Sequence, residues 1–221
     1  MKDGGRKPFN YMAVVGIVFL IVIGFAIFNM LKTTDSGIVG FGEVDIGEKA
    51  EPFAVPVATS DLRGDANIDP DQACSVEGSD AIRICDFFGR PFVVSFWFTK
   101  GASGCLDQQD VFDEVATRYR GKAGFLSVNV RDDREKVREE IEDRGWKVEV
   151  GHDEDGAVSN LYKVGGCPTI LFYDRNAVLT EALIEPTDAG ELGAQVRSLI
   201  NGQSQATQQK GTSEPNTGST G

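Results

Sequence analysis

The chain has 221 residues and a formal net charge of −12. Such an acidic composition argues against a nucleic-acid-binding protein, because binding to phosphates requires a basic patch. The length accommodates one domain of about 150 residues with extensions at its ends. A hydrophobic content of 41% is enough to build the core of such a domain.

Residues 12–31 read MAVVGIVFLIVIGFAIFNML and contain no charged side chain. A helix of this length spans about 30 Å, the thickness of the hydrocarbon core of a bilayer. A cleaved signal peptide is the alternative, but its apolar part is shorter and ends in small residues. This run ends in Asn29, Met30 and Leu31. We therefore expect an uncleaved transmembrane anchor.

Basic residues flank the predicted anchor mainly on its N-terminal side. Lys2, Arg6 and Lys7 precede it, and only Lys32 follows it before an acidic stretch. The positive-inside rule then predicts a single-pass protein of the cell membrane, with residues 1–11 in the cytoplasm and the rest outside. That compartment permits disulfides, so the four cysteines are candidates for redox chemistry.

The remainder divides into a linker at 32–50, one compact domain at 51–201 and a polar tail at 202–221 that we expect to be disordered. Thr187 is the expected N-cap of the last helix. The alternation of apolar runs and amphipathic stretches indicates an α/β fold, with a mixed central sheet flanked by helices. The predicted strands are 91–98, 124–130, 147–153, 168–174 and 177–185, and the predicted helices are 105–120, 132–144, 155–163 and 187–200.

Four stretches in this order resemble landmarks of the thioredoxin fold. They are GEKAEPFAVP (47–56), GRPFVVSFWF (89–98), DEDGAVSNLY (153–162) and VGGCPTILFYD (164–174), the last of which matches the strand start that carries the family's cis-proline. The set is similar to the membrane-anchored TlpA/ResA-type oxidoreductases, which grade into the AhpC/TSA redoxins. The resemblance implies a thioredoxin-like fold and thiol chemistry without a cofactor. The implied partners are protein thiols, protein disulfides or peroxide.

The stretch FWFTKGASGC, which ends at Cys105, departs from the family's W-x-x-x-C-x-x-C site. Gly101 and Gly104 occupy the expected cysteine positions, and Cys105 comes one residue late. In length the stretch matches the peroxiredoxin pattern F-Y-P-x-x-x-T-x-G-C, but Phe98 and Ala102 replace its proline and threonine. Because that threonine helps to hold the peroxide, its absence argues against peroxidase activity.

Cys105 stands at the predicted start of a helix, where unpaired N–H groups and the helix dipole favour the reactive thiolate. Lys100 would add to this effect, whereas Asp107 and Asp110 would oppose it. The alternative is a small buried residue that only packs at the helix start. We take Cys105 as the candidate nucleophile.

Cys167 directly precedes Pro168. The resemblance places this loop against the start of the active-site helix, and therefore Cys167 beside Cys105. It implies a two-cysteine redox centre assembled across loops, provided that the two Cα atoms lie within about 7 Å. The alternative is that Cys167 only packs there. The resemblance also makes Pro168, Trp97 and Lys100 candidates for binding the substrate.

Cys74 and Cys85 lie on either side of the polar turn at 77–80. If these segments form a hairpin, a structural disulfide would stabilise it by about 2–3 kcal/mol. The alternative is an auxiliary redox pair that passes electrons to Cys105. His152 is the only histidine and has no neighbouring cysteine, so we expect no metal site and a solvated side chain at a strand end.

Three functions therefore stay open. The favoured one is a thiol–disulfide oxidoreductase that uses Cys105 with Cys167. The others are a single-cysteine thiol peroxidase that uses Cys105 alone, and a thioredoxin-fold module that binds protein chains without redox activity. The residues give no indication of oligomeric state.

Overall fold

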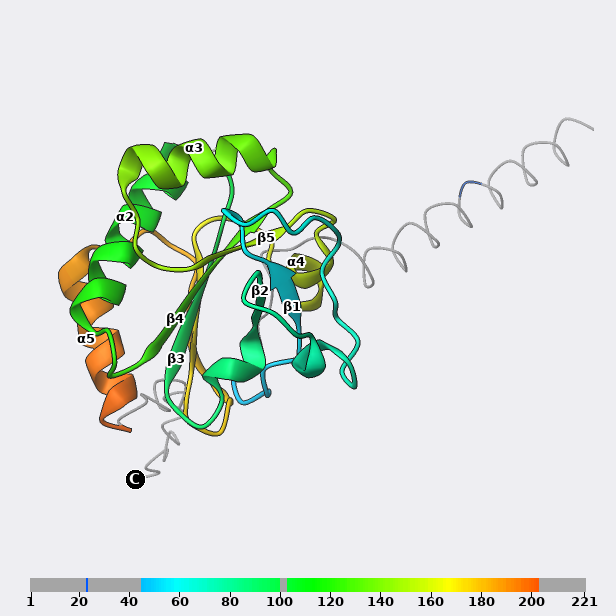
Figure 1. Cartoon of the computed structure of the whole chain (residues 1–221). Coiled ribbons are helices and arrows are strands. Elements are labelled where there is room, and N and C mark those ends of the chain that lie inside the picture. The colour runs from blue at the N-terminus through cyan, green and yellow to red at the C-terminus, as the bar shows by residue number, and fades with distance from the viewer. Residues whose placement is uncertain (1–22, 24–44, 100–102, 203–221) are drawn as a thin grey trace, which may run out of the picture. The chain divides into compact units, whose positions relative to one another are not determined.

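The computed structural model describes residue 23, residues 45–99 and residues 103–202 (Figure 1). Apart from Ile23, the predicted anchor at 12–31 lies outside these residues, and so do the predicted cytoplasmic segment and nearly all of the predicted tail. None of the helices in the described part of the chain is long and apolar enough to cross a bilayer.

A five-stranded sheet with the order β5-β4-β3-β6-β7 forms the centre of the domain. Strands β3, β4 and β5 run parallel, while β6 and β7 are antiparallel to their neighbours. The α/β fold with a mixed sheet is thus confirmed. The strands are β3 (Phe92–Trp97), β4 (Gly124–Val130), β5 (Val150–Asp153), β6 (Thr169–Tyr173) and β7 (Leu179–Leu183).

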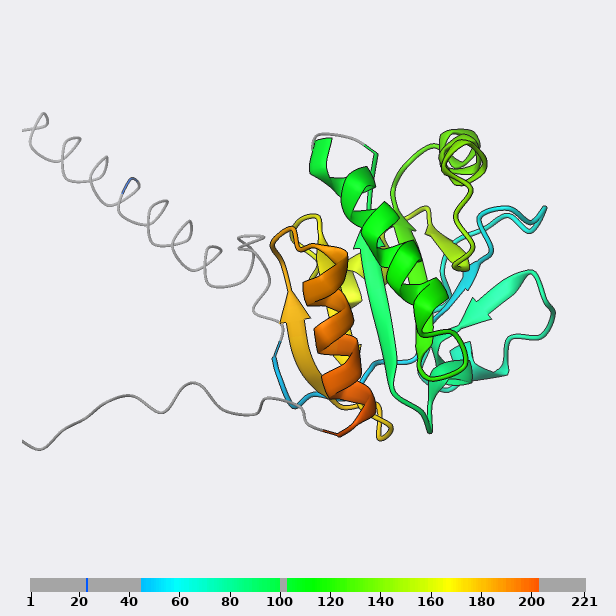
Figure 2. The same cartoon turned by 90° about the vertical axis from the view of Figure 1, so that its left-hand side faces the viewer.

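Helices cover both faces of this sheet. The helices α2 and α5 lie on one face (Figure 2), where Phe112 and Leu192 pack against Val93. On the other face, Phe96 packs with Val158 at α4. Every residue of β3 is buried, which explains why its sequence is apolar except for Ser95. The helices are α2 (Ser103–Arg118), α3 (Arg134–Arg144), α4 (Ala157–Leu161) and α5 (Ala189–Ile200).

A second, two-stranded sheet packs beside β5. Its strands β1 (Ala54–Pro56) and β2 (Ala81–Arg83) are antiparallel, and Val57 continues β1 into a bridge with Gly151. A side chain at Gly151 would overlap the Cγ2 atom of Val55, so the two sheets approach closely only because this position lacks one.

The predictions at the two ends of the domain differ from the structure. Asp188, not Thr187, caps α5, because its carboxylate accepts the N–H groups of Gly190 and Glu191. The Thr187 hydroxyl instead donates to the Glu191 carboxylate. Residues 47–50 were predicted as part of a linker. They pair instead with the chain at the start of β7, where the Gly47 N–H donates to the carbonyl of Leu179 and Lys49 bridges to Val178.

Candidate functional site

Cys105 is the third residue of α2, the helix that follows β3. The first N–H groups of a helix have no partners within it, and they favour a negative charge at this end. The Cys105 residue is 1% exposed. It therefore lies beneath the surface at the end of the helix that best accommodates a thiolate.

Cys167 lies between α4 and β6, and its peptide bond to Pro168 is cis. It is joined to Cys105 by a disulfide, with the two sulfur atoms 2.08 Å apart and the two Cα atoms 5.6 Å apart. The distance condition set from the sequence is met. Cys167 is partly exposed, in contrast to Cys105, so it is the more accessible residue of the pair.

Two of the three predicted substrate-binding residues, Trp97 and Pro168, are buried. Trp97 is 1% exposed, its indole N–H donates to the Ser127 hydroxyl at 2.7 Å, and its ring packs edge-to-face on Trp146. Cys167 packs against this aromatic cluster, so Trp97 supports the site from below. Pro168 is also buried. Lys100 lies outside the described residues.

The acidic residues near the start of α2 are partly neutralised. Arg144 approaches Asp107 at 3.9 Å and Asp110 at 2.6 Å. Asp110 also accepts the indole N–H of Trp146 at 2.7 Å. The positive charge of Arg144 therefore partly offsets the negative charge of Asp107 and Asp110, which was expected to oppose a Cys105 thiolate.

A buried polar network lies at the end of β3, and the sequence reasoning missed it. The Asp132 carboxylate accepts the Thr99 N–H at 2.5 Å, the Thr99 hydroxyl at 2.8 Å and the Asn129 side-chain amide at 2.8 Å. His152 is 0% exposed and its Nε2 lies 3.0 Å from the Asp132 carbonyl oxygen. The prediction of a solvated His152 was wrong, because β5 places this ring in the interior, against the backbone of Asp132.

The Asp153–Tyr162 motif is structural. Asp153 accepts the N–H groups of Val158 and Ser159 and so holds the start of α4. Burial raises the pKa of Asp153, and these two hydrogen bonds oppose the rise. The Tyr162 hydroxyl donates to the Glu51 carbonyl at 2.6 Å, and burial raises its pKa well above the ordinary value. The motif ties α4 to the sheet and to the chain that enters β1.

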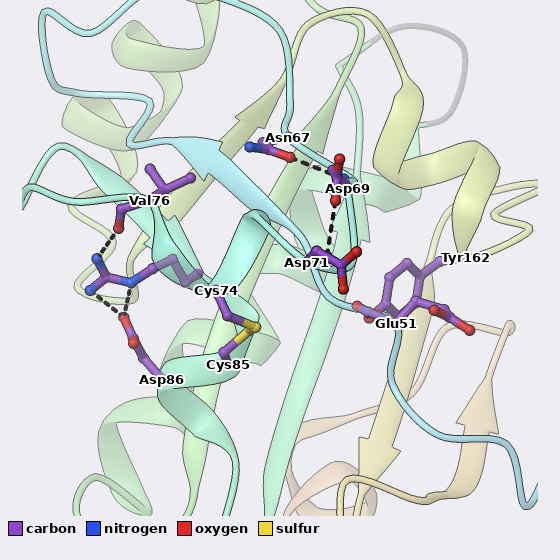
Figure 3. The surroundings of a disulfide bond; sticks show 10 residues. Glu51, Asn67, Asp69, Asp71, Cys74, Val76, Cys85, Asp86 and Tyr162 are labelled. Atoms are coloured by element: carbon purple, nitrogen blue, oxygen red, sulfur yellow. Dashed lines mark hydrogen bonds and ion pairs between the residues drawn. A yellow bond between two sulfur atoms is a disulfide. The ribbon is translucent and has the colours of Figure 1, made fainter.

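Cys74 and Cys85 form a second disulfide, with Cα atoms 5.6 Å apart (Figure 3). They lie on two 3-10 helices, Ala73–Ser75 and Ile84–Phe87, and not on a hairpin as predicted. Arg83 also bridges this loop: its guanidinium donates to the Val76 carbonyl and pairs with Asp86.

The two disulfides lie at opposite ends of β3. Cys85 belongs to the 3-10 helix that precedes this strand, and Cys105 belongs to the helix that follows it. A six-residue strand is about 17 Å long. Thiol–disulfide exchange requires sulfur atoms in contact, so the structure does not bring Cys74 and Cys85 into position to exchange with Cys105 in one molecule.

Within the described residues, no group of three or more His, Cys, Asp or Glu side chains could hold a metal ion. The chemistry that the site offers is that of its two sulfur atoms.

Comparison with known proteins gives the same class of fold. Residues 46–182 match the model of the AhpC/TSA family. The thiol-disulfide oxidoreductase ResA from Oceanobacillus iheyensis is 26% identical over 101 residues, which cover 45% of this chain and 52% of that protein. The match therefore spans about half the length of that relative.

Two solved structures share the fold. A thiol:disulfide interchange protein of the thioredoxin family from Chlorobium tepidum aligns over 70% of this chain and 97% of its own, with a TM-score of 0.55 and 14% identity. A DsbF homologue from Corynebacterium diphtheriae aligns over 72% of this chain and 91% of its own, with a TM-score of 0.55 and 16% identity. The domain is therefore thioredoxin-like.

Proposed function

The chain belongs to the AhpC/TSA family, and we propose that it is a thiol–disulfide oxidoreductase whose redox centre is the Cys105–Cys167 pair. The pair itself carries the proposal. Two cysteines 62 positions apart lie in disulfide contact, at the start of α2 and beside Pro168. A centre assembled from a helix start and a distant loop takes the place of the family's two cysteines within one helix. The similarity to ResA supports the same chemistry.

We base the roles of the two cysteines on their exposure. Cys167 is partly exposed and Cys105 is 1% exposed, and on this ground we assign the attack of an incoming thiolate to the Cys167 sulfur. This differs from the sequence-based expectation, in which Cys105 attacks the substrate. The helix start favours Cys105 as a thiolate, and a stabilised thiolate is the better leaving group.

The reaction balances with protein thiols as the only other reactant. A substrate thiolate attacks Cys167, the Cys105–Cys167 bond breaks, and Cys105 leaves as a thiolate. A second substrate thiolate then attacks the substrate sulfur of the mixed disulfide, and Cys167 leaves. The substrate is oxidised by two electrons to a disulfide, and the protein becomes a dithiol. The reverse sequence reduces a substrate disulfide.

Reciprocal serine variants test both the function and the roles. Cys105→Ser retains Cys167 without its internal partner, so mixed disulfides with substrate proteins should accumulate on Cys167. Cys167→Ser retains only the buried Cys105 and should trap at least about tenfold less, because exchange depends on access. The measurement is mass spectrometry of non-reduced, alkylated samples, and the Cys105→Ser/Cys167→Ser double variant is the control. If neither single variant forms mixed disulfides and the wild-type pair never exchanges with a dithiol, the proposed function is wrong.

We also propose that residues 12–31 anchor the protein in the cell membrane, with the domain outside the cytoplasm. The support is the uncharged run of sequence and the basic residues that precede it. The full chain should stay with membranes after washing at alkaline pH, and deletion of 12–31 should release it. External protease should digest the domain in spheroplasts. Domain protection in intact spheroplasts, with digestion after lysis, would reverse the topology.

A further inference from the structure

The end of β3 is held by a carboxylate from another part of the sheet. Asp132, which is 5% exposed, follows β4, and its side chain receives three hydrogen bonds. Two come from Thr99, through its backbone N–H at 2.5 Å and its hydroxyl at 2.8 Å. Thr99 stands two residues beyond the end of β3 and six residues before Cys105. Asp132 therefore fixes Thr99, the last described residue before the start of α2.

Asp132 is itself held in place from two strands. The Asn129 amide of β4 donates to the same carboxylate at 2.8 Å, and His152 of β5 lies 3.0 Å from the Asp132 carbonyl oxygen. Asn129 and His152 are paired positions of neighbouring strands, and both are 0% exposed. Contacts with the sheet therefore hold Asp132 in place independently of its hydrogen bonds to Thr99.

We infer that Asp132 is a positioning residue for the Cys105–Cys167 pair, which it serves by anchoring Thr99 to the sheet. The inference rests on the proposed function. In the reduced protein no bond joins the two sulfurs, so their closeness depends on how firmly the chain holds each cysteine. A higher effective concentration of one thiol at the other favours disulfide formation. Asp132 raises that effective concentration by limiting the positions open to Cys105.

The test measures the reduction potential of the pair in the full chain. The protein is equilibrated with mixtures of reduced and oxidised dithiothreitol, then alkylated, and the modified fractions of the Cys105 and Cys167 peptides are determined by mass spectrometry. We expect Asp132→Ala to lower the equilibrium constant for disulfide formation about tenfold. That change makes the pair easier to reduce by about 30 mV.

A neighbouring carboxylate provides the matched control. Asp133 caps α3 by accepting the N–H groups of Glu135 and Lys136, and it is exposed. Asp133→Ala should lower the stability of the domain through loss of the cap. It should leave the potential unchanged, because it weakens the oxidised and reduced forms equally. An equal shift of potential in Asp133→Ala would overturn the inference.

Three milder variants separate positioning from folding. Asp132→Asn keeps one oxygen for both N–H donors, and its amide can donate to the Thr99 hydroxyl, so its potential should stay near wild type. Thr99→Val removes only the hydroxyl bond and should shift the potential in the same direction as Asp132→Ala by a smaller amount, and Thr99→Ser should restore it. These variants decide the question if Asp132→Ala does not fold. Wild-type potential in both Asp132→Ala and Thr99→Val overturns the inference while leaving the proposed function intact, whereas a wild-type pair that never titrates overturns the function.

Discussion

The Asp153 carboxylate holds the start of α4 from a buried position. It accepts the N–H groups of Val158 and Ser159, at 3.1 Å and 2.8 Å, and is 0% exposed. Burial raises its pKa above the ordinary value of 3.8. The folded protein therefore keeps the Asp153 proton at pH values at which the unfolded chain has already lost it. The stability that this proton contributes is complete below pH 3.8 and is lost as the pH rises through the raised pKa.

Substitution of Asp153 by asparagine tests this pH dependence. Asp153→Asn cannot titrate, so its unfolding free energy lacks this contribution, while shifts at other groups such as Glu181 are common to both proteins. We expect the stability of the wild type relative to Asp153→Asn to be greater at pH 4 than at pH 7. Urea unfolding at a series of pH values measures the difference. A relative stability that increases from pH 4 to pH 7 would show that the pKa of Asp153 is lowered instead.

Polar residues occur in the interior of several strands, which explains why His152 was wrongly predicted to be solvated. Four such residues are at most 2% exposed: Ser95, Ser127, Asn129 and His152. Each satisfies part of its hydrogen bonding inside the protein, as when Ser127 accepts the indole N–H of Trp97. In a sequence, a polar residue near the end of a strand is typical of an exposed position. Only the tertiary partners show that these side chains lie in the interior.

At the level of elements, the helices and strands with strong local signals were predictable. The buried β3 is apolar apart from Ser95, and β4 was located at its observed ends, 124–130. The predicted helix at 132–144 begins at Arg134, because Asp133 caps it, and it ends where Gly145 adopts a left-handed conformation with φ 67°. These signals are local, since each depends on residues within one or two turns.

Elements whose shape depends on tertiary contacts were not predictable. Cys74 and Cys85 lie on 3-10 helices, although the polar turn between them is typical of a hairpin. Gly151 resembles a breaker in a strand, yet it marks the place where Val55 of β1 packs against β5. Neither feature has a signal in its own segment, because the partner that determines it comes from elsewhere in the chain.

In the whole molecule, the candidate site depends on a contact between two cysteines that are 62 positions apart in the sequence. No local pattern connects Cys105 with Cys167. Their proximity was implied only by the resemblance to the thioredoxin fold, in which a proline loop lies against a helix start. The structure brings the two residues together through β6, which pairs antiparallel with β3 and carries Cys167 back toward α2. The order of strands, and not the spacing of cysteines, assembles the pair.

The separation of the two disulfides along β3 predicts that stability and redox chemistry can be changed independently. The Cys74–Cys85 bond closes a loop with a sequence separation of 11. A disulfide that closes a loop of this size stabilises the folded protein by about 3 kcal/mol, because it lowers the entropy of the unfolded chain. Cys74→Ser/Cys85→Ser should therefore lower the unfolding free energy by about that amount.

The same double variant should leave the reduction potential of the Cys105–Cys167 pair unchanged. The sulfurs of this pair are separated from positions 74 and 85 by the length of β3, about 17 Å. Thiol–disulfide exchange between the two pairs cannot occur across that distance. Urea unfolding and titration of the pair with dithiothreitol measure the two quantities on one preparation. If the potential shifts together with the stability, then Cys74 and Cys85 are coupled to the site, and the auxiliary redox role regains support. A loss of stability with a constant potential means that this disulfide only holds the 3-10 helices together.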